Sequence, residues 1–193
     1  MKVVLIPCGP TEWHDEGRLL GRVEVPLTAR GEQRCDQWRA ALAAQSIRKL
    51  FHSPDDLASR TAGLIGNPLG IPTKPLEELC EVDVGLWAGL TEKEMKTRYA
   101  TAHRELCEAP LNVRPPSGEK LSDAVARLQT CLKKRVKPNG KSTIALVLRP
   151  FSFAVARCAL QGEGFSSVWE SARSVTDPVV VECDGVPACS RSS

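Results

Sequence analysis

The sequence predicts an α/β fold, a three-layer sandwich in which a mostly parallel central sheet carries helices on both faces. Short apolar runs rich in β-branched residues alternate with segments of helical periodicity, an order typical of a parallel sheet with covering helices. The 193 residues are 42% hydrophobic and 25% charged, which suits one globular domain with a sizeable core. No linker or repeat interrupts the chain, so we expect a single domain over residues 1–184 and a flexible polar tail over residues 185–193.

The first half of the chain opens with a strand that we expect to be buried. Residues 3–6 are all valine, leucine or isoleucine, and they end at a turn rich in proline and glycine. Thr28 is a suitable N-cap for a helix that continues to about residue 44, with Trp38, Ala41 and Leu42 on one face. The elements that follow are a strand over 49–52, a helix over 57–65 and a short edge strand within 66–75.

The second half contains the most strand-like run, residues 144–148, which we expect at the centre of the sheet. Its other predicted elements are helices over 91–98, 121–134 and 151–161 and a last strand over 179–182. Cys8 and Arg149 each come directly after a predicted strand. Because the carboxyl ends of parallel strands share one edge of a sheet, we expect one ligand crevice between these two residues.

The charge pattern names no partner and is not that of a nucleic-acid-binding protein. Lys and Arg number 26 and Asp and Glu 23, a formal net charge of +3, and no basic stripe runs between the tryptophans. The basic residues between 133 and 141 follow a predicted helix, where cations interact favourably with the helix dipole. No apolar run approaches the length of a membrane span or a signal-peptide core. We therefore expect neither nucleic acid nor membrane as a partner.

The cysteines predict a reducing compartment and no metal site. The sequence has 8 cysteines but no C-x-x-C pair, so zinc binding is not expected. Most of these cysteines stand in apolar stretches, where a reduced thiol behaves as a small buried hydrophobic group. We expect a cytoplasmic protein that needs no metal and no cofactor.

Several motifs together resemble the histidine phosphatase superfamily, the phosphoglycerate-mutase-like proteins. Residues 5–31 are L-I-P-C-G-P-T-E-W-H-D-E-G-R-L-L-G-R-V-E-V-P-L-T-A-R-G, similar to the family's opening L-I-R-H-G-x-T-E-W-N-x-x-G-R-x-Q-G-x-x-D-x-P-L-T-x-x-G. Further blocks that match family motifs lie at 53–62, 79–90, 116–119 and 144–150. The resemblance covers most of the chain and implies a phosphoglycerate-mutase-like fold.

The first motif departs from the family at its chemical positions. The resemblance implies a phosphate-binding arginine followed by a histidine that attacks phosphorus, and this chain has Pro7 and Cys8 there. His14 stands where the family has asparagine. Proline supplies neither a positive charge nor a backbone N–H. The usual nucleophile is therefore absent, and loss of an attacking group can slow a covalent mechanism by a factor of about 10⁶.

The remaining positions are also changed, with one exception. Leu57 stands at the second phosphate-binding arginine and Arg149 at the second histidine, while Glu81 matches the family's proton-donating carboxylate. The scaffold motifs around these positions are intact. This combination predicts a catalytically inactive, histidine-phosphatase-like pseudoenzyme with a binding or regulatory role.

An enzyme of altered mechanism is the alternative hypothesis. It would be a metal-independent phosphohydrolase acting on a phosphomonoester, with Cys8 or water as the nucleophile and Glu81 as the acid. Cys8 and His14 have the spacing of the C-x5-R loop of cysteine phosphatases, with histidine in place of the arginine. Against this, Cys8 is equally explained as an inert thiol after a buried strand, and Glu81 as a carboxylate hydrogen-bonded to a loop.

The candidate ligand-binding residues are His14, Arg18 and Arg149, which together would form a small anion pocket, since arginine binds carboxylate and phosphate bidentately. The competing hypothesis is that Arg149 pairs internally with Glu81. The partner expected from the sequence is a small anionic ligand or another protein. Dimers occur in the family the chain resembles, so a homodimer is compatible with the sequence, which leaves the oligomeric state open.

Overall fold

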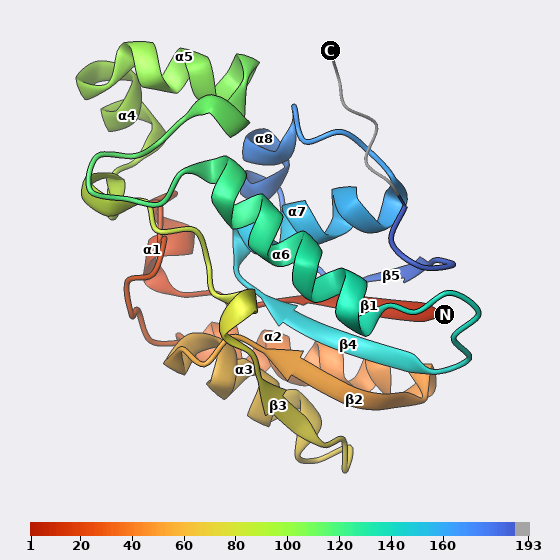
Figure 1. Ribbon diagram of the computed structural model, residues 1–193. Coiled ribbons are helices and arrows are strands. Elements are labelled where there is room, and N and C mark those ends of the chain that lie inside the picture. The colour runs from red at the N-terminus through yellow and green to blue at the C-terminus, as the bar shows by residue number, and fades with distance from the viewer. Residues whose placement is uncertain (188–193) are drawn as a thin grey trace.

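The computed structural model describes residues 1–187, and its central element is a five-stranded sheet of order β3-β2-β4-β1-β5 (Figure 1). The strands are β1 (Lys2–Pro7), β2 (Ile47–His52), β3 (Thr73–Pro75), β4 (Thr143–Leu148) and β5 (Val179–Glu182). β1 pairs with β4, and β2 pairs with both β3 and β4, all in parallel, while β5 runs antiparallel to β1. The predicted α/β fold is confirmed, with β4 at the centre of the sheet.

Helices cover both faces of the sheet (Figure 1). One face carries α2 (Ala29–Leu42) and α3 (Asp56–Gly66), and the other carries α6 (Leu121–Arg135) and α7 (Pro150–Gln161). The remaining helices are α1 (Glu12–Asp15), α4 (Glu92–Arg98), α5 (Ala100–Glu108) and α8 (Val168–Arg173).

Alternate residues of β1 enter two different cores, because successive side chains of a strand point to opposite faces. Val3 and Leu5 belong to the cluster that includes α6 and α7, whereas Val4 and Ile6 belong to the cluster that includes α2 and α3. All four side chains are 0% exposed. A continuous apolar run is therefore the pattern that a strand buried on both faces requires.

Two helix starts next to the site are set by side-chain caps. The side chain of Thr28 accepts a hydrogen bond from the backbone N–H of Gly31, as expected for the N-cap of α2. The carboxylate of Asp55 likewise accepts from Ala58 at the start of α3. Asp55 was not among the predicted site residues, and its second role appears below.

The C-terminal segment begins as packed chain instead of a flexible tail. Val186 packs against the larger core cluster, and Gly185 lies beside Pro138 in a conformation with φ of 85°. The first residues of the predicted tail are therefore packed against the core, and the domain boundary after residue 184 stays a prediction. Residues 188–193 of that tail lie outside the described residues.

The carboxylate of Glu92 in α4 contacts residues of α8 and α5. These contacts predict that the stability of the protein depends on pH. Glu92 pairs with Arg173, with Lys96 at 3.0 Å and with Nε2 of His103 at 3.3 Å. Hydrogen bonds from Arg173 and Lys96 lower the pKa of Glu92 to about 2 from an ordinary 4.5. Because the folded-state pKa is lowered, the stabilisation is complete above pH 4.5 and disappears as the pH falls towards 2.

We expect the Glu92→Gln variant to be less stable than the wild type at pH 6 by about 1 kcal/mol, since partly exposed pairs are screened by solvent. This difference should shrink as urea titrations are repeated at decreasing pH towards 3. The matched control is Glu105→Gln, at an exposed position. A difference between wild type and Glu92→Gln that stays constant over this pH range would contradict the prediction.

Candidate functional site at the carboxyl ends of β1 and β4

The loops after β1 and β4 meet at one edge of the sheet, as the sequence predicts. The backbone N–H of Cys8 donates to the carbonyl oxygen of Leu148 at 2.9 Å. This bond extends the β1–β4 pairing by one residue, so that Cys8 lies next to Arg149 at the start of α7.

Cys8 is a buried thiol with an unfavourable environment for ionisation. Its side chain is 5% exposed. Burial raises the pKa of Cys8 well above its ordinary value, the negative charge of Asp55 raises it further, and Arg149 only partly opposes these effects. Because the thiolate is the nucleophilic form of cysteine, this environment keeps Cys8 unreactive near neutral pH.

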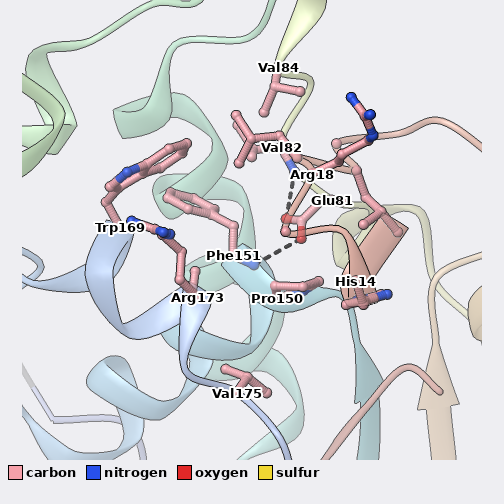
Figure 2. A pocket seen from close by; sticks show the side chains of 15 residues that line it. His14, Arg18, Glu81, Val82, Val84, Pro150, Phe151, Trp169, Arg173 and Val175 are labelled. Atoms are coloured by element: carbon pink, nitrogen blue, oxygen red, sulfur yellow. Dashed lines mark hydrogen bonds between the residues drawn. The ribbon is translucent and has the colours of Figure 1, made fainter. Parts of the chain in front are cut away.

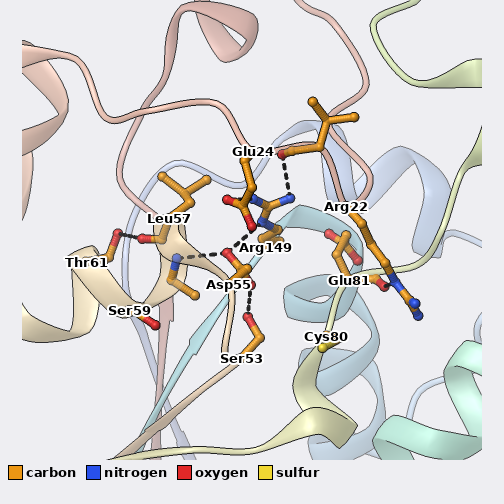
Figure 3. Close-up of polar contacts among 12 residues, drawn as sticks. Arg22, Glu24, Ser53, Asp55, Leu57, Ser59, Thr61, Cys80, Glu81 and Arg149 are labelled. Atoms are coloured by element: carbon orange, nitrogen blue, oxygen red, sulfur yellow. Dashed lines mark hydrogen bonds and ion pairs between the residues drawn. The ribbon is translucent and has the colours of Figure 1, made fainter.

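Arg149 is 1% exposed and donates four hydrogen bonds inside the protein (Figure 3). Its Nε bonds to Asp55 at 3.2 Å, and Nη2 contacts Glu24 at 3.4 Å. Nη1 bonds to the carbonyl oxygens of Gly21 and Val23 at 2.6 and 3.0 Å. A guanidinium has five N–H donors, so this pattern leaves little of Arg149 for a ligand.

One hypothesis for Arg149 is corrected by these contacts. Within residues 1–187 its ion pairs are with Asp55 and Glu24, and not with Glu81. The anion pocket of His14, Arg18 and Arg149 stays a prediction, and protein oxygens hold four of the five donors of Arg149. Arg149 ties the start of α7 to the cap of α3 and to the segment before α2.

Glu81 is 4% exposed and caps α7 from a distant loop. Its Oε1 accepts from the backbone N–H groups of Val82 and Ser152 and from the Ser152 hydroxyl, at 2.8 to 3.0 Å. Its Oε2 accepts from the N–H of Phe151 at 2.9 Å. Burial raises the pKa of Glu81, although these hydrogen bonds and Arg149 act to lower it. The geometry suits a carboxylate, since a helix N-terminus favours negative charge.

His14 is held as a neutral imidazole with a defined tautomer. Its Nδ1 accepts from the backbone N–H of Thr11 at 3.2 Å and lies 2.9 Å from the Thr11 hydroxyl. An accepting Nδ1 places the ring proton on Nε2. Burial lowers the pKa of His14, and the positive charge of Arg149 lowers it further. His14 therefore contributes an N–H donor and no charge near neutral pH.

A cavity of about 180 Å³ brings together three of the predicted site residues, His14, Arg18 and Glu81 (Figure 2). Phe151 and Trp169 form part of its wall. Cys8 and Arg149 are not among the residues that line it. Cys8 instead lines a neighbouring cavity of about 600 Å³, and both cavities are lined by His14, Pro150, Arg173 and Val175. The negative charge of Glu81 also contributes to the raised pKa of Cys8.

The two positions at which the family resemblance implies phosphate-binding arginines are apolar. Leu57 is 2% exposed and packs in the core cluster under α2 and α3. Pro7 is buried at the end of β1. Trp169 was expected in the core or in the wall of a crevice, whereas Asp55 and Glu24 were not among the expected site residues. The only local signal for Asp55 was its position before a predicted helix, and Glu24 carried none.

Within residues 1–187 no group of three or more histidine, cysteine, aspartate and glutamate side chains is arranged to hold a metal ion. None of the helices in this part of the chain combines the length and apolar character needed to cross a membrane.

Known proteins similar to this chain are phosphatases and mutases by name. Phosphoserine phosphatase 1 of Hydrogenobacter thermophilus is 24% identical over 169 residues, covering 88% of this chain and 80% of that protein. The probable phosphoglycerate mutase GpmB of Salmonella choleraesuis is 33% identical over 142 residues, covering 69% of this chain and 64% of that protein. This chain therefore spans less than two thirds of the length of GpmB.

Solved structures show the same fold. Bacillus stearothermophilus YhfR superposes with a TM-score of 0.81 at 24% identity, covering 96% of this chain and 92% of that one. Mycobacterial glucosyl-3-phosphoglycerate phosphatase in complex with VO3 gives a TM-score of 0.75 at 20% identity, with coverage of 88% and 86%. The family model described as histidine phosphatase superfamily (branch 1) matches residues 3–186, and this chain belongs to that superfamily.

Proposed function

We propose that this protein is a pseudoenzyme of the histidine phosphatase superfamily, which acts by binding or regulation and not by phosphoryl transfer. The observation that carries the proposal is the buried Arg149, whose donors are held by Asp55, Glu24 and two backbone carbonyls. Charge-assisted hydrogen bonds to arginine are the main source of phosphate affinity in a site of this kind. A phosphomonoester would have to compete with these internal contacts to form such hydrogen bonds with Arg149.

Electrostatics support the same proposal. Near the former phosphate position, the single buried cation Arg149 faces the carboxylates of Asp55 and Glu24, with Glu81 close enough to feel its charge. An incoming dianion would meet more negative than positive charge there. Cys8, the residue at the nucleophile position, is held as a thiol. Both the binding and the attack steps of the family's chemistry therefore lack their usual support.

The alternative, a phosphohydrolase using Cys8 or water with Glu81 as acid, has one observation in its favour. Burial raises the pKa of Glu81, as a general acid requires. The same carboxylate, however, accepts hydrogen bonds from three backbone N–H groups and a hydroxyl. These donors favour the ionised form, which has no proton to give.

An assay of aryl phosphate hydrolysis separates the two functions. We expect purified protein to show no turnover with phenyl phosphate between pH 5 and 8 beyond that of the Cys8→Ala and Glu81→Gln variants. Phosphoserine phosphatase 1 of Hydrogenobacter thermophilus, assayed alongside with phosphoserine, checks the conditions. Turnover that disappears in either variant would establish the phosphohydrolase instead, and loss in Cys8→Ala would identify the thiol as its nucleophile.

We further propose that the protein works in the cytoplasm, which the buried thiols of Cys8, Cys35 and Cys131 support. Its partner is proposed to be a small ligand or another protein, including a second copy of the chain. Light scattering on a gel-filtration column would measure the oligomeric state directly.

A further inference from the structure

The cavity beside Glu81 combines a carboxylate with aromatic and aliphatic walls. Phe151 and Trp169 lie on one side and Val82 and Val84 on another, with the carboxylate of Glu81 between them (Figure 2). Neither phosphate-binding arginine of the family is present there. The other polar side chains that line the cavity are those of His14, Arg18 and Arg173.

The two oxygens of Glu81 differ in how fully they are used. Oε1 accepts three hydrogen bonds, and Oε2 accepts one, from the N–H of Phe151. A carboxylate oxygen has two lone-pair sites, so Oε2 retains the capacity to accept a further donor. The protein donors are the N–H groups of Val82, Phe151 and Ser152 and the Ser152 hydroxyl. Because Glu81 lines the cavity, a ligand there can supply the further donor.

The cations at the edge of the cavity are already paired. Arg18 contacts Glu16 and, at 3.8 Å, Glu94, and Arg173 contacts Glu92. Below the cavity, Arg149 is paired with two carboxylates. Each of these arginines has acidic partners, whereas within residues 1–187 no cation is in contact with the carboxylate of Glu81. The site is electrostatically suited to a positive ligand and not to a phosphate.

We propose that this cavity binds a small primary amine with an aromatic or branched apolar body, whose ammonium group donates to Oε2 of Glu81. This inference rests on the proposed non-catalytic function and names its ligand class. The ammonium would form a charge-assisted hydrogen bond, while the rings of Phe151 and Trp169 contact its body and provide faces that attract cations. The anionic ligand expected from the sequence is replaced by one of opposite charge.

The cavity volume limits the size of this ligand. Its value of about 180 Å³ is close to that of apolar cavities that hold one benzene molecule, roughly 150 Å³. A phenyl ring with a two-carbon amine is therefore an appropriate probe. We choose 2-phenylethylamine, together with 2-phenylethanol and 3-phenylpropionate, which have similar bodies and carry neutral and negative ends.

Titrations at pH 7.5 by calorimetry, with tryptophan fluorescence as a second signal from Trp169, test the proposal. We expect the amine to bind at least about tenfold more tightly than the alcohol or the acid, the effect of one charge-assisted hydrogen bond. Equal or tighter binding of the acid would overturn the proposal. So would the absence of amine binding up to about 10 mM. If the amine does not bind and the protein also shows no phosphatase turnover, the proposed non-catalytic function still stands.

Two variants locate the binding site. Glu81→Gln, if folded by circular dichroism, should weaken amine binding about tenfold and leave alcohol binding unchanged. Ala172→Leu adds bulk to the cavity wall without touching Glu81, and it should weaken binding of the amine and the alcohol alike. Ala126→Leu, the same change at an exposed site of α6, should have no effect. Unchanged amine affinity in Ala172→Leu would place the ligand elsewhere and overturn the proposal.

Discussion

Replacing Arg149 by methionine should destabilise the protein by about 3–5 kcal/mol, the range found when one partner of a buried ion pair is removed. The substitution leaves the 16% exposed side chain of Asp55 without its cation. It also frees the carbonyl oxygens of Gly21 and Val23 from their donors. Urea unfolding followed by circular dichroism measures the loss as a shift of the midpoint at unchanged slope.

The matched control is Arg30→Met, which removes the same side chain from a position that is 78% exposed and paired with Asp15. We expect a change of at most about 1 kcal/mol there, since surface ion pairs contribute little. If Arg149→Met were as stable as Arg30→Met, the internal contacts of Arg149 would carry no stability. The main support for a non-catalytic function would then be lost.

The second large effect is expected for Glu81→Gln, with a loss of about 2–3 kcal/mol. Glutamine keeps one acceptor oxygen but places an NH₂ group against N–H donors at the start of α7, where the carboxylate now accepts from Phe151 and Ser152. Buried donors left without an acceptor cost about 1–3 kcal/mol, and the charge that complements the helix dipole is also removed. The raised pKa of Glu81 offsets part of this loss, because the wild type bears the cost of burying a charge.

Hydrogen exchange of the first turn of α7 gives this prediction a local readout. Amide protons of Phe151 and Ser152 should exchange faster in Glu81→Gln, while those of α2 stay unchanged. Glu105→Gln, an exposed change of the same kind, is the control and should affect neither. Unaltered exchange at Phe151 and Ser152 would mean that Glu81 does not cap α7.

The sheet and its main helices were predictable because their patterns are local. The run over 144–148 contains only apolar residues, and in the structure it lies between two parallel neighbours, where both faces are buried. Thr28 marks the start of α2 through its own hydrogen bond. Such signals need no knowledge of distant residues.

The elements that were missed lack this kind of signal. α5 begins after Tyr99 without a side-chain cap, so no N-cap residue marks its start, and it has a single buried residue, Leu106. α8 is only 6 residues long, and Ser167 at its N-cap position makes no side-chain cap hydrogen bond. Its position comes from tertiary packing, in which Val168 and Trp169 are buried against the core.

The sequence alone indicated which family residues are absent from the site, but not which contacts Arg149 makes there. Comparison with the family motif located the changed positions, including Arg149. The partners of Arg149 are Asp55 and Glu24, which are 94 and 125 residues away in sequence. No short-range pattern connects residues at such separations, and Glu81 was an equally reasonable partner on charge alone. Only the folded chain distinguishes these acids.

The order of the strands also bears on how the chain is made. β1 is synthesised first, yet both of its neighbours, β4 and β5, come from the last part of the chain. During translation the first strand therefore emerges as an apolar segment that has no edge to pair with until residues 143–148 have left the ribosome. Only β2 and β3 can pair earlier. Late pairing of this kind lengthens the exposure of an aggregation-prone strand, so the nascent chain is a natural client for chaperones that bind extended apolar segments.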